Sequence, residues 1–158
     1  MRNVVLARVD DRLIHGQVMT GWVPILKANR LIIADDASAE NKLTRRVLEA
    51  SAHGSIKVSV YTVEKAAEML LRPPKDNNER FLLLVTSPVT IRELVKRGCS
   101  FREVNLGGMG MYEDRKPFFR NLACSGEEIA AIRELDQQGI RVYYQLVPEQ
   151  KKINYSDF

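Results

Sequence analysis

The chain has 158 residues, of which 45% are hydrophobic and 28% are charged, and its formal net charge is +4. This composition is typical of one folded globular domain and excludes a largely disordered chain, and no apolar run is long enough to span a membrane. The basic residues are scattered among acids and aromatic residues make up only 7%, so the charge does not indicate a nucleic-acid-binding surface.

Short apolar runs alternate with longer segments of helical periodicity in the first half of the chain. In chain order they predict strand 3–9, helix 17–28, strand 31–34, a helix from residue 38 or 39 to residue 52, strand 56–61 and helix 63–71. The last of these helices is expected to begin after a Thr62 cap and to end before Pro73. This alternation is typical of a parallel α/β sheet.

The second half of the chain continues the alternation. It predicts strand 81–85, helix 88–96, strand 103–106, a helix that begins at a capping box of Ser125 and Glu128 and ends at residue 138, and strand 140–147. Residues 111–123 are predicted as an extended hairpin or an edge strand, and residues 151–158 as a surface segment. Because no linker or repeat interrupts the chain, the sequence predicts a single α/β domain over residues 1–158, with an open, mostly parallel sheet flanked by helices.

The loop after the first predicted strand carries the residues best suited to chemistry. Residues 10–17 (DDRLIHGQ) hold two acids, an arginine and one of only two histidines, directly before a predicted helix. Open parallel sheets bind ligands at the carboxyl ends of their strands, and a helix N-terminus favours a bound phosphate. Gly16 lets the backbone approach such a group, and Arg12 can donate charge-assisted hydrogen bonds to its oxygens. The loop therefore predicts a phosphate-handling site.

His15 is the natural nucleophile of this loop. A free imidazole has a pKa of about 6.5, so a ring nitrogen is available to attack phosphorus at neutral pH. A neighbouring Asp could hold the proton of the other ring nitrogen and so fix the tautomer. On the residues alone, the alternative of a histidine that only hydrogen-bonds the loop backbone stays open.

Further candidate site residues follow two later strands. Thr86 and Ser87 come directly after strand 81–85, where their hydroxyls would either face phosphate or cap the next helix. Gly107 and Gly108 begin a glycine-rich loop that suits the same edge of the sheet but is not a nucleotide-binding motif. These positions would form the wall opposite the first loop.

The cysteines and the second histidine give no sign of a metal or redox site. Cys99 and Cys124 are the only cysteines, and their spacing indicates neither a disulfide framework nor a metal knuckle, so we expect two reduced thiols. His53 precedes Gly54 at a predicted helix end, where a capping or solvated role is expected. Neither histidine has a cysteine or acid at metal-ligand spacing, and we expect no metal and no cofactor.

Residues 8–18 (RVDDRLIHGQV) resemble the signature loop of the mannose/fructose/sorbose family of phosphotransferase system (PTS) EIIB components, which carries a phosphorylated histidine. Segments 31–36, 82–88, 105–109 and 126–148 are similar to further parts of the family, so the resemblance covers nearly the whole chain. Residues 111–124 depart from it, with a charged run at 113–116 and two phenylalanines. The resemblance implies an antiparallel element near the C-terminal end of a mostly parallel sheet.

The same resemblance implies a function. The chain would be a protein-Nπ-phosphohistidine–sugar phosphotransferase, peripherally associated with a membrane transporter. A cytoplasmic location is expected as well, because the first residues become polar too soon for a secretory signal. His15, through Nδ1, would accept a phosphoryl group from phospho-EIIA and pass it to a sugar delivered by the membrane components EIIC and EIID. The residues name neither the sugar nor the oligomeric state, for which a homodimer is one candidate.

In this hypothesis Arg12 and Asp10 act with His15 in catalysis. The residues expected to bind phosphate or substrate, or to shape the loop that does, are Arg8, Gly16, Gln17, Thr86, Ser87, Gly107 and Gly108. Two other functional classes stay open: a non-catalytic sensor of a nucleotide or phosphometabolite in the same pocket, and a protein-interaction module with a basic partner face. A sensor would carry no covalent phosphate on His15, and an interaction module would keep its partner in a His15→Ala variant.

Overall fold

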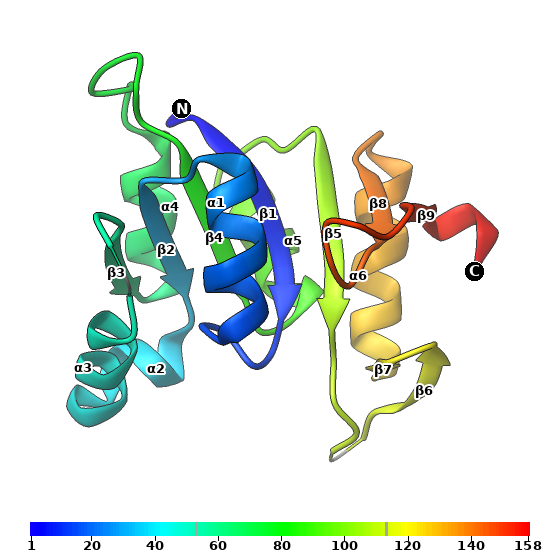
Figure 1. The fold of residues 1–158 in the computed structure, drawn as a ribbon. Coiled ribbons are helices and arrows are strands. Elements are labelled where there is room, and N and C mark those ends of the chain that lie inside the picture. Colours follow the sequence, from blue (N-terminus) through cyan, green and yellow to red (C-terminus); the bar gives the residue numbers. More distant parts are fainter. Residues whose placement is uncertain (53, 113) are drawn as a thin grey trace.

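The computed structural model describes residues 1–52, 54–112 and 114–158 and shows a single α/β domain (Figure 1). The strands are β1 (Val4–Asp10), β2 (Arg30–Ala34), β3 (Lys57–Tyr61), β4 (Phe81–Val85), β5 (Glu103–Gly108), β6 (Lys116–Phe119), β7 (Leu122–Cys124), β8 (Arg141–Tyr144) and β9 (Ile153–Asn154). The helices are the π-helix η1 (Val18–Trp22), α1 (Val23–Leu26), α2 (Asp36–Glu40), α3 (Lys42–Ala50), α4 (Val63–Leu71), α5 (Pro88–Lys96), α6 (Gly126–Gln137) and the 3-10 helix η2 (Tyr155–Asp157). Two residues lie outside the described ones: His53, for which a capping or solvated role is expected, and Glu113 of the charged run.

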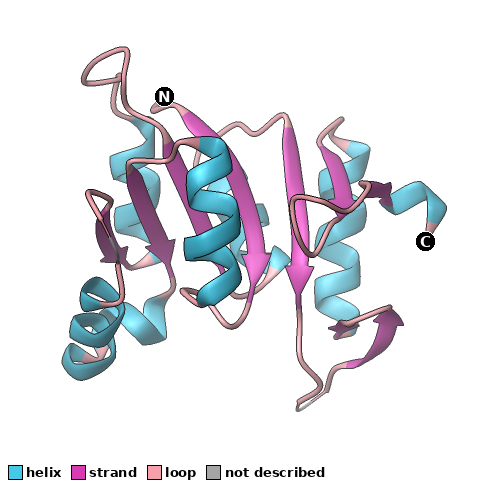
Figure 2. Ribbon diagram, in the orientation of Figure 1, coloured by secondary structure: helices cyan, strands magenta, loops and turns pink. Residues whose placement is uncertain are grey.

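The described strands form a seven-stranded sheet and a separate two-stranded pair. The order in the larger sheet is β3-β2-β4-β1-β5-β8-β9, and neighbours run parallel except β8 and β9, which are antiparallel. Figure 2 shows the helices that alternate with these strands along the chain. The predicted fold class is therefore confirmed, including its antiparallel element near the C-terminal end.

Helices cover both faces of the sheet (Figure 1). All five residues of β4 are buried, as expected for a central strand with a core on each side. One face packs on α4, α5 and α6 through side chains such as Val9, and the other packs on the first helical segment through Leu84 and Trp22. Because side chains alternate along a strand, Arg8 and Asp10 of β1 share the second face.

The first helix differs from the expected helix over residues 17–28. It contains the π-helical turn η1, continues as α1 and ends at Lys27, whose φ of 52° is left-handed. The wide π turn ends at Trp22, two residues before Pro24, which lacks an N–H and cannot pack its ring against the carbonyl four residues earlier. The local sequence therefore explains the irregular turn.

The expected helix from residue 38 or 39 to 52 is also two elements. Helix α2 begins earlier, after Asp35 accepts a hydrogen bond from the N–H of Ser38, and it ends at Asn41. Asn41 has extended backbone (φ −99°, ψ 107°), and its side chain accepts from the N–H of Thr44 to cap α3. An Asn in that position competes with the helical hydrogen bonds and starts a new helix.

The C-terminal third shows one confirmed expectation and three differences. Residues 116–124 form the antiparallel pair β6–β7, in agreement with the predicted hairpin. Strand β5 extends through Gly107 and Gly108, which were expected to begin a loop, and β8 is shorter than the expected strand 140–147. The tail is part of the fold, because β9 pairs with β8 and Phe158 stacks on Phe119 with ring centroids 4.2 Å apart. Among the described helices, none is long and apolar enough to cross a membrane.

Candidate functional site

The loop after β1 folds back over the carboxyl edge of the sheet. The N–H of Asp11 donates to the carbonyl of Gly108 at 3.1 Å, and the N–H of Leu13 donates to the carbonyl of Asp10 at 2.9 Å. Leu13 has a φ of 57°, a region that a non-glycine residue rarely adopts. Its side chain is buried in the core under the first helix, which offsets the strain. The chain is thereby turned so that His15 returns to the end of β1.

Asp10 is the centre of this site. Its side chain is fully buried, and its Oδ2 lies 3.0 Å from Nη2 of Arg8, 2.8 Å from Nη2 of Arg12 and 3.1 Å from Nε2 of His15. Its Oδ1 accepts from Nε of Arg12 at 2.9 Å, so Arg12 binds the carboxylate with two nitrogens. The structure therefore brings together the three residues that the sequence hypothesis assigned to catalysis.

The contact with Asp10 orients the imidazole of His15. A carboxylate accepts hydrogen bonds, so Nε2 at 3.1 Å is assigned as the protonated nitrogen. In a neutral ring this leaves the lone pair on Nδ1. The His15 side chain is 16% exposed, so the ring is held largely within the protein while retaining access to solvent. The arrangement presents one oriented nitrogen nucleophile.

The charges around Asp10 keep it ionised. Burial alone would raise the pKa of Asp10, but hydrogen bonds from His15 and Arg12 and the charges of Arg8 and Arg12 outweigh it and hold that pKa well below its usual range. The same hydrogen bond to Asp10 raises the pKa of Arg12. The carboxylate is thus a permanent acceptor for the imidazole.

Arg8 lies in the core beneath the Asp10 carboxylate, on β1. Its Nη1 donates to Oδ1 of Asn105 at 2.6 Å and to the carbonyl of Gln145 at 3.0 Å, and its Nη2 donates to the carbonyl of Leu146 at 3.0 Å. Its Cζ lies 5.1 Å from the ring centroid of Trp22. Because its side chain is fully buried, Arg8 can support the Asp10 carboxylate but cannot contact a ligand.

Gly16 and Gln17 lie on the open side of the site. Both residues are exposed, and a Cβ added at Gly16 would meet nothing within 4 Å. Oε1 of Gln17 accepts from Nη2 of Arg12 at 3.4 Å. The Arg12 side chain is itself 44% exposed, so its guanidinium can face a ligand while it stays bonded to Asp10.

Gly107 and Gly108 lie against the arginines. A Cβ on Gly107 would come 2.2 Å from Cζ of Arg8, and a Cβ on Gly108 would lie 3.3 Å from Oδ1 of Asp10 and 3.5 Å from Nη2 of Arg12. Both glycines are buried in β5. Their lack of a side chain therefore makes room for Arg8, Arg12 and the Asp10 carboxylate, whereas the sequence predicted a wall that binds phosphate or substrate.

Thr86 and Ser87 have structural partners. The Ser87 hydroxyl donates to Oε2 of Glu128 at 2.8 Å and accepts from the N–H of Val89 at 3.2 Å, which caps α5. The carbonyl of Thr86 accepts from Nη2 of Arg115 at 3.3 Å. Of the two alternatives for Ser87, the structure shows the helix cap, and it places the hydroxyl toward Glu128 instead of an incoming phosphate.

Sequence reasoning missed Arg115, which connects the loops at this edge of the sheet. Its side chain is 9% exposed and binds Oδ2 of Asp11 at 2.7 Å, both carboxylate oxygens of Glu128 at 2.8 Å and the carbonyl of Gly110 at 3.2 Å. Tyr112 donates its hydroxyl to the same Asp11 oxygen. Arg115 belongs to the unassigned charged run at 113–116, and nothing in its sequence spacing predicted three distant partners.

The cysteines and the described acids offer no second centre. Among the described residues, no group of three or more His, Cys, Asp or Glu side chains is placed to hold a metal ion. Cys99 and Cys124 are buried and free, and burial raises the pKa of the Cys124 thiol to about 12. The nucleophile that the site offers is therefore the imidazole.

The chain is similar to several proteins of the phosphotransferase system. Residues 4–158 match the family described as "PTS system sorbose subfamily IIB component". The chain is 32% identical to the sorbose-specific EIIB component of Klebsiella pneumoniae, over 98% of this chain and 93% of that protein. It is 31% identical to the mannose-specific EIIAB component of Escherichia coli K12 over 96% of its own length and 47% of that protein. The crystal structure of the IIBSor domain of the K. pneumoniae sorbose permease superposes with a TM-score of 0.89, covering 96% of this chain and 93% of that one.

Proposed function

The chain belongs to the sorbose subfamily of PTS EIIB components, and from that premise we propose that it carries a phosphoryl group on Nδ1 of His15. Members of this family transfer phosphoryl groups during sugar uptake, together with EIIA and the membrane components EIIC and EIID. In the proposal, His15 accepts the group from a phosphohistidine of EIIA and passes it to the sugar that enters through EIIC and EIID.

One observation carries the assignment of the nucleophile. Nε2 of His15 faces the buried, ionised carboxylate of Asp10 at 3.1 Å, so the proton resides on Nε2 and the lone pair on Nδ1. Phosphorylation adds positive charge to the imidazole, and the carboxylate stabilises that charge. Asp10 therefore acts as the positioning residue of the reaction.

The two half-reactions exchange one bond for another at phosphorus. In the first, the P–N bond of the donor phosphohistidine breaks as the bond from Nδ1 of His15 forms. In the second, that P–N bond breaks as a sugar hydroxyl oxygen bonds to phosphorus, and the hydroxyl proton leaves to solvent or to the membrane component. Arg12 lies on the same carboxylate oxygen as His15, so its exposed guanidinium can bind the phosphoryl oxygens.

The backbone beside His15 completes the proposed site. The helical backbone begins at Gly16 and runs into η1 and α1, so its unpaired N–H groups lie next to the phosphorylated ring. Because nothing lies within 4 Å of a Cβ at Gly16, a partner protein can approach there closely. Phosphoryl transfer depends mainly on positioning and charge stabilisation, which these groups provide.

The proposal includes a cytoplasmic location beside the membrane transporter, since both the EIIA donor and the phosphorylated sugar are on that side. One relative at 31% identity has EIIA and EIIB in a single chain, which supports EIIA as the donor. The two relatives named above differ in sugar, one sorbose-specific and one mannose-specific. The proposal leaves the sugar open and assigns its choice mainly to the membrane components.

The proposal is tested by phosphorus NMR of the purified protein after incubation with phosphoenolpyruvate, the general PTS proteins and a cognate EIIA. We expect an acid-labile phosphoimidazole signal that disappears in His15→Ala and persists in His53→Ala, a variant of the only other histidine. Sugar phosphorylation by His15→Ala at the wild-type rate would refute the proposal. A folded wild-type protein that gives no signal with several EIIA partners would instead support a non-covalent phosphometabolite sensor.

A further inference from the structure

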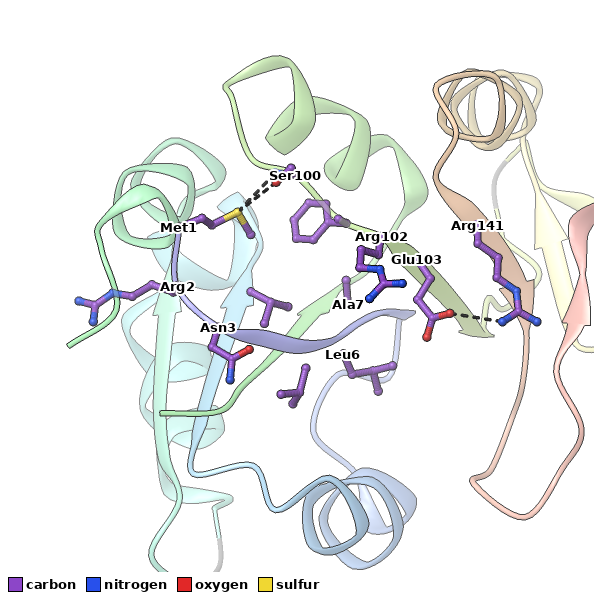
Figure 3. A pocket seen from close by; sticks show the side chains of 12 residues that line it. Met1, Arg2, Asn3, Leu6, Ala7, Ser100, Arg102, Glu103 and Arg141 are labelled. Atoms are coloured by element: carbon purple, nitrogen blue, oxygen red, sulfur yellow. Dashed lines mark hydrogen bonds and ion pairs between the residues drawn. The ribbon is translucent and has the colours of Figure 1, made fainter. Parts of the chain in front are cut away.

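A cavity lies at the edge of the sheet opposite His15. It has a volume of about 650 Å³ and opens at the amino ends of β1 and β5 (Figure 3). The lining residues are Met1, Arg2, Asn3, Val4, Val5, Leu6, Ala7, Ser100, Phe101, Arg102, Glu103 and Arg141. None of them belongs to the His15 site, so the cavity is a separate feature of the fold.

The cavity exists because two neighbouring strands diverge. Pairing of β1 with β4 begins at Val4, whereas pairing of β1 with β5 covers only Arg8 to Asp10. In Figure 1 the two strands separate toward the N-terminal end. The four consecutive residues 4–7 of β1 line the gap. Because side chains alternate along a strand, four consecutive lining residues mean that the backbone edge of β1 itself forms a wall. That wall presents peptide N–H and C=O groups that need partners.

The side chains around the gap carry excess positive charge. Glu103 binds Arg141 at 3.5 Å and Lys152 at 2.8 Å, so its charge is already matched by two cations. Arg102 extends into the space beside Ala7 (Figure 3) and is exposed. Among the described residues, its guanidinium has no hydrogen bond or ion pair. These groups therefore leave a local excess of two positive charges.

We propose that this cavity binds a small phosphate ester that carries hydroxyl groups, with the phosphate on Arg102. The volume lies within the range of about 300–1,000 Å³ typical of small-molecule sites. A phosphate monoester has a charge of about −1.5 to −2 at pH 7, which matches the excess around Arg102, and a guanidinium binds phosphate oxygens with two donors. Hydroxyl groups both donate and accept, so they suit the mixed backbone wall of β1. A site of this kind would let the level of a phosphorylated metabolite act on the protein away from His15.

The test is an amide NMR titration of the full-length, ¹⁵N-labelled protein with glucose 6-phosphate, with glucose and inorganic phosphate titrated in parallel. We expect saturable shifts at Val5, Ala7 and residues 100–103 with glucose 6-phosphate, weaker ones with phosphate and none with glucose. Arg102→Gln should raise the dissociation constant about tenfold or more, because it removes one charge-assisted contact. Arg46→Gln, which changes an exposed arginine on α3, should leave the constant unchanged.

The location of the shifts separates this inference from the proposed function. Shifts confined to residues 10–17 would mean that the probe binds only the His15 loop, and would overturn the second site. Equal response to glucose, or a dissociation constant unaffected by Arg102→Gln in a protein with an otherwise native spectrum, would overturn it as well. None of these outcomes depends on phosphorylation of His15. The proposed phosphate-ester site can therefore be refuted while the proposed phosphoryl transfer by His15 is kept, and the proposed transfer can be refuted while the site is kept.

Discussion

The guanidinium of Arg8 lies so close to Gly107 that a Cβ on Gly107 would come 2.2 Å from Cζ of Arg8. Arg8 is fully buried, and one of its nitrogens binds the Asp10 carboxylate at 3.0 Å. The absence of a side chain at one position of β5 thus determines where the carboxylate that orients His15 can lie. The glycine belongs to the site although it touches no ligand.

Gly107→Ala should therefore displace Arg8 and disturb both stability and transfer. We expect the free energy of unfolding to fall by about 2–3 kcal/mol, the cost of overpacking a tight interior. Phosphorylation of His15 should slow as well, because Asp10 loses its supporting cation. Urea unfolding and the rate of phosphoryl uptake measure the two effects. The matched control is Gly126→Ala, where nothing lies within 4 Å of the new Cβ, and a Gly107→Ala protein as stable as this control would contradict the prediction.

Asp10→Asn should impair phosphoryl transfer more than the small change in shape suggests. The amide leaves the buried Arg8 without its counter-ion and can present an N–H to Nε2 of His15, which would favour the wrong tautomer. We expect transfer to slow by about 100-fold or more, comparable to the loss of one preorganised electrostatic contact. Stability should fall by about 3 kcal/mol, as when a buried ion pair loses one partner.

Rapid-quench measurement of phosphoryl uptake gives the transfer rate of Asp10→Asn. Urea unfolding gives its free energy of unfolding. Asp136→Asn, at an exposed position of α6, removes the same charge without these contacts and serves as the control. Wild-type transfer by a folded Asp10→Asn protein would show that the carboxylate does not set the tautomer.

Arg12→Ala should slow transfer while the fold is kept. The Arg12 side chain is 44% exposed, so its ion pair with Asp10 contributes less than about 1 kcal/mol to stability. Loss of its contact with the phosphoryl oxygens should reduce the rate by about 10- to 100-fold. Arg12→Lys should recover part of this, because it restores the charge but not the two-pronged geometry. A rate equal to that of wild type in Arg12→Ala would remove Arg12 from the mechanism.

Helices and strands were predicted correctly where their signals lie in residues close together in the sequence. Helix α4, with its Thr62 cap, and helix α6, with the Ser125–Glu128 capping box, have the predicted starts. The break at Asn41 and the π turn before Pro24 were missed, although both residues are local signals that interrupt a helix. Amphipathic periodicity continues across such a break, so it hides the change of helix.

The site was predicted less completely than the fold because most of its contacts are distant in sequence. Asp10, Arg12 and His15 lie within six residues of one another, and a single loop motif was enough to suggest them. The partners of Arg115, at positions 11, 86 and 128, come from three separate segments and meet only in the folded chain. No spacing rule connects them, so their role required the structure.

Thiol chemistry should not affect the protein in its native state. Burial raises the pKa of the Cys124 thiol to about 12 and also raises that of Cys99, and the thiolate is the form that reacts. We therefore expect little reaction with N-ethylmaleimide at pH 7 and unchanged phosphoryl uptake after treatment. Mass spectrometry should find both thiols alkylated once the protein is unfolded in urea. Rapid native modification accompanied by loss of uptake would contradict this and would implicate a cysteine in transfer.

The interaction of Glu128 with Arg115 and Ser87 should make stability depend on pH in the acid range. Burial alone would raise the pKa of Glu128, but hydrogen bonds from Arg115 and Ser87 lower it below its usual value. A carboxyl whose pKa is lower in the folded state contributes stability that is complete above its unfolded pKa, about 4.3. That contribution is lost as the pH falls through the folded pKa. Glu128→Gln should therefore cost about 1–3 kcal/mol at pH 7, and the cost should shrink below about pH 4.

Urea unfolding of wild type and Glu128→Gln between pH 7 and pH 2 measures that cost directly. The control is the neighbouring Glu127→Gln, because Glu127 is 68% exposed and its contact with Arg92 lies at the surface. Its effect should be small at every pH. If the cost of Glu128→Gln stays constant down to pH 2, or grows as the pH falls, the carboxylate is not the ionised partner of Arg115. The contact of Arg115 with α6 would then be a hydrogen bond to a neutral Glu128, while the ion pair of Arg115 with Asp11 would remain.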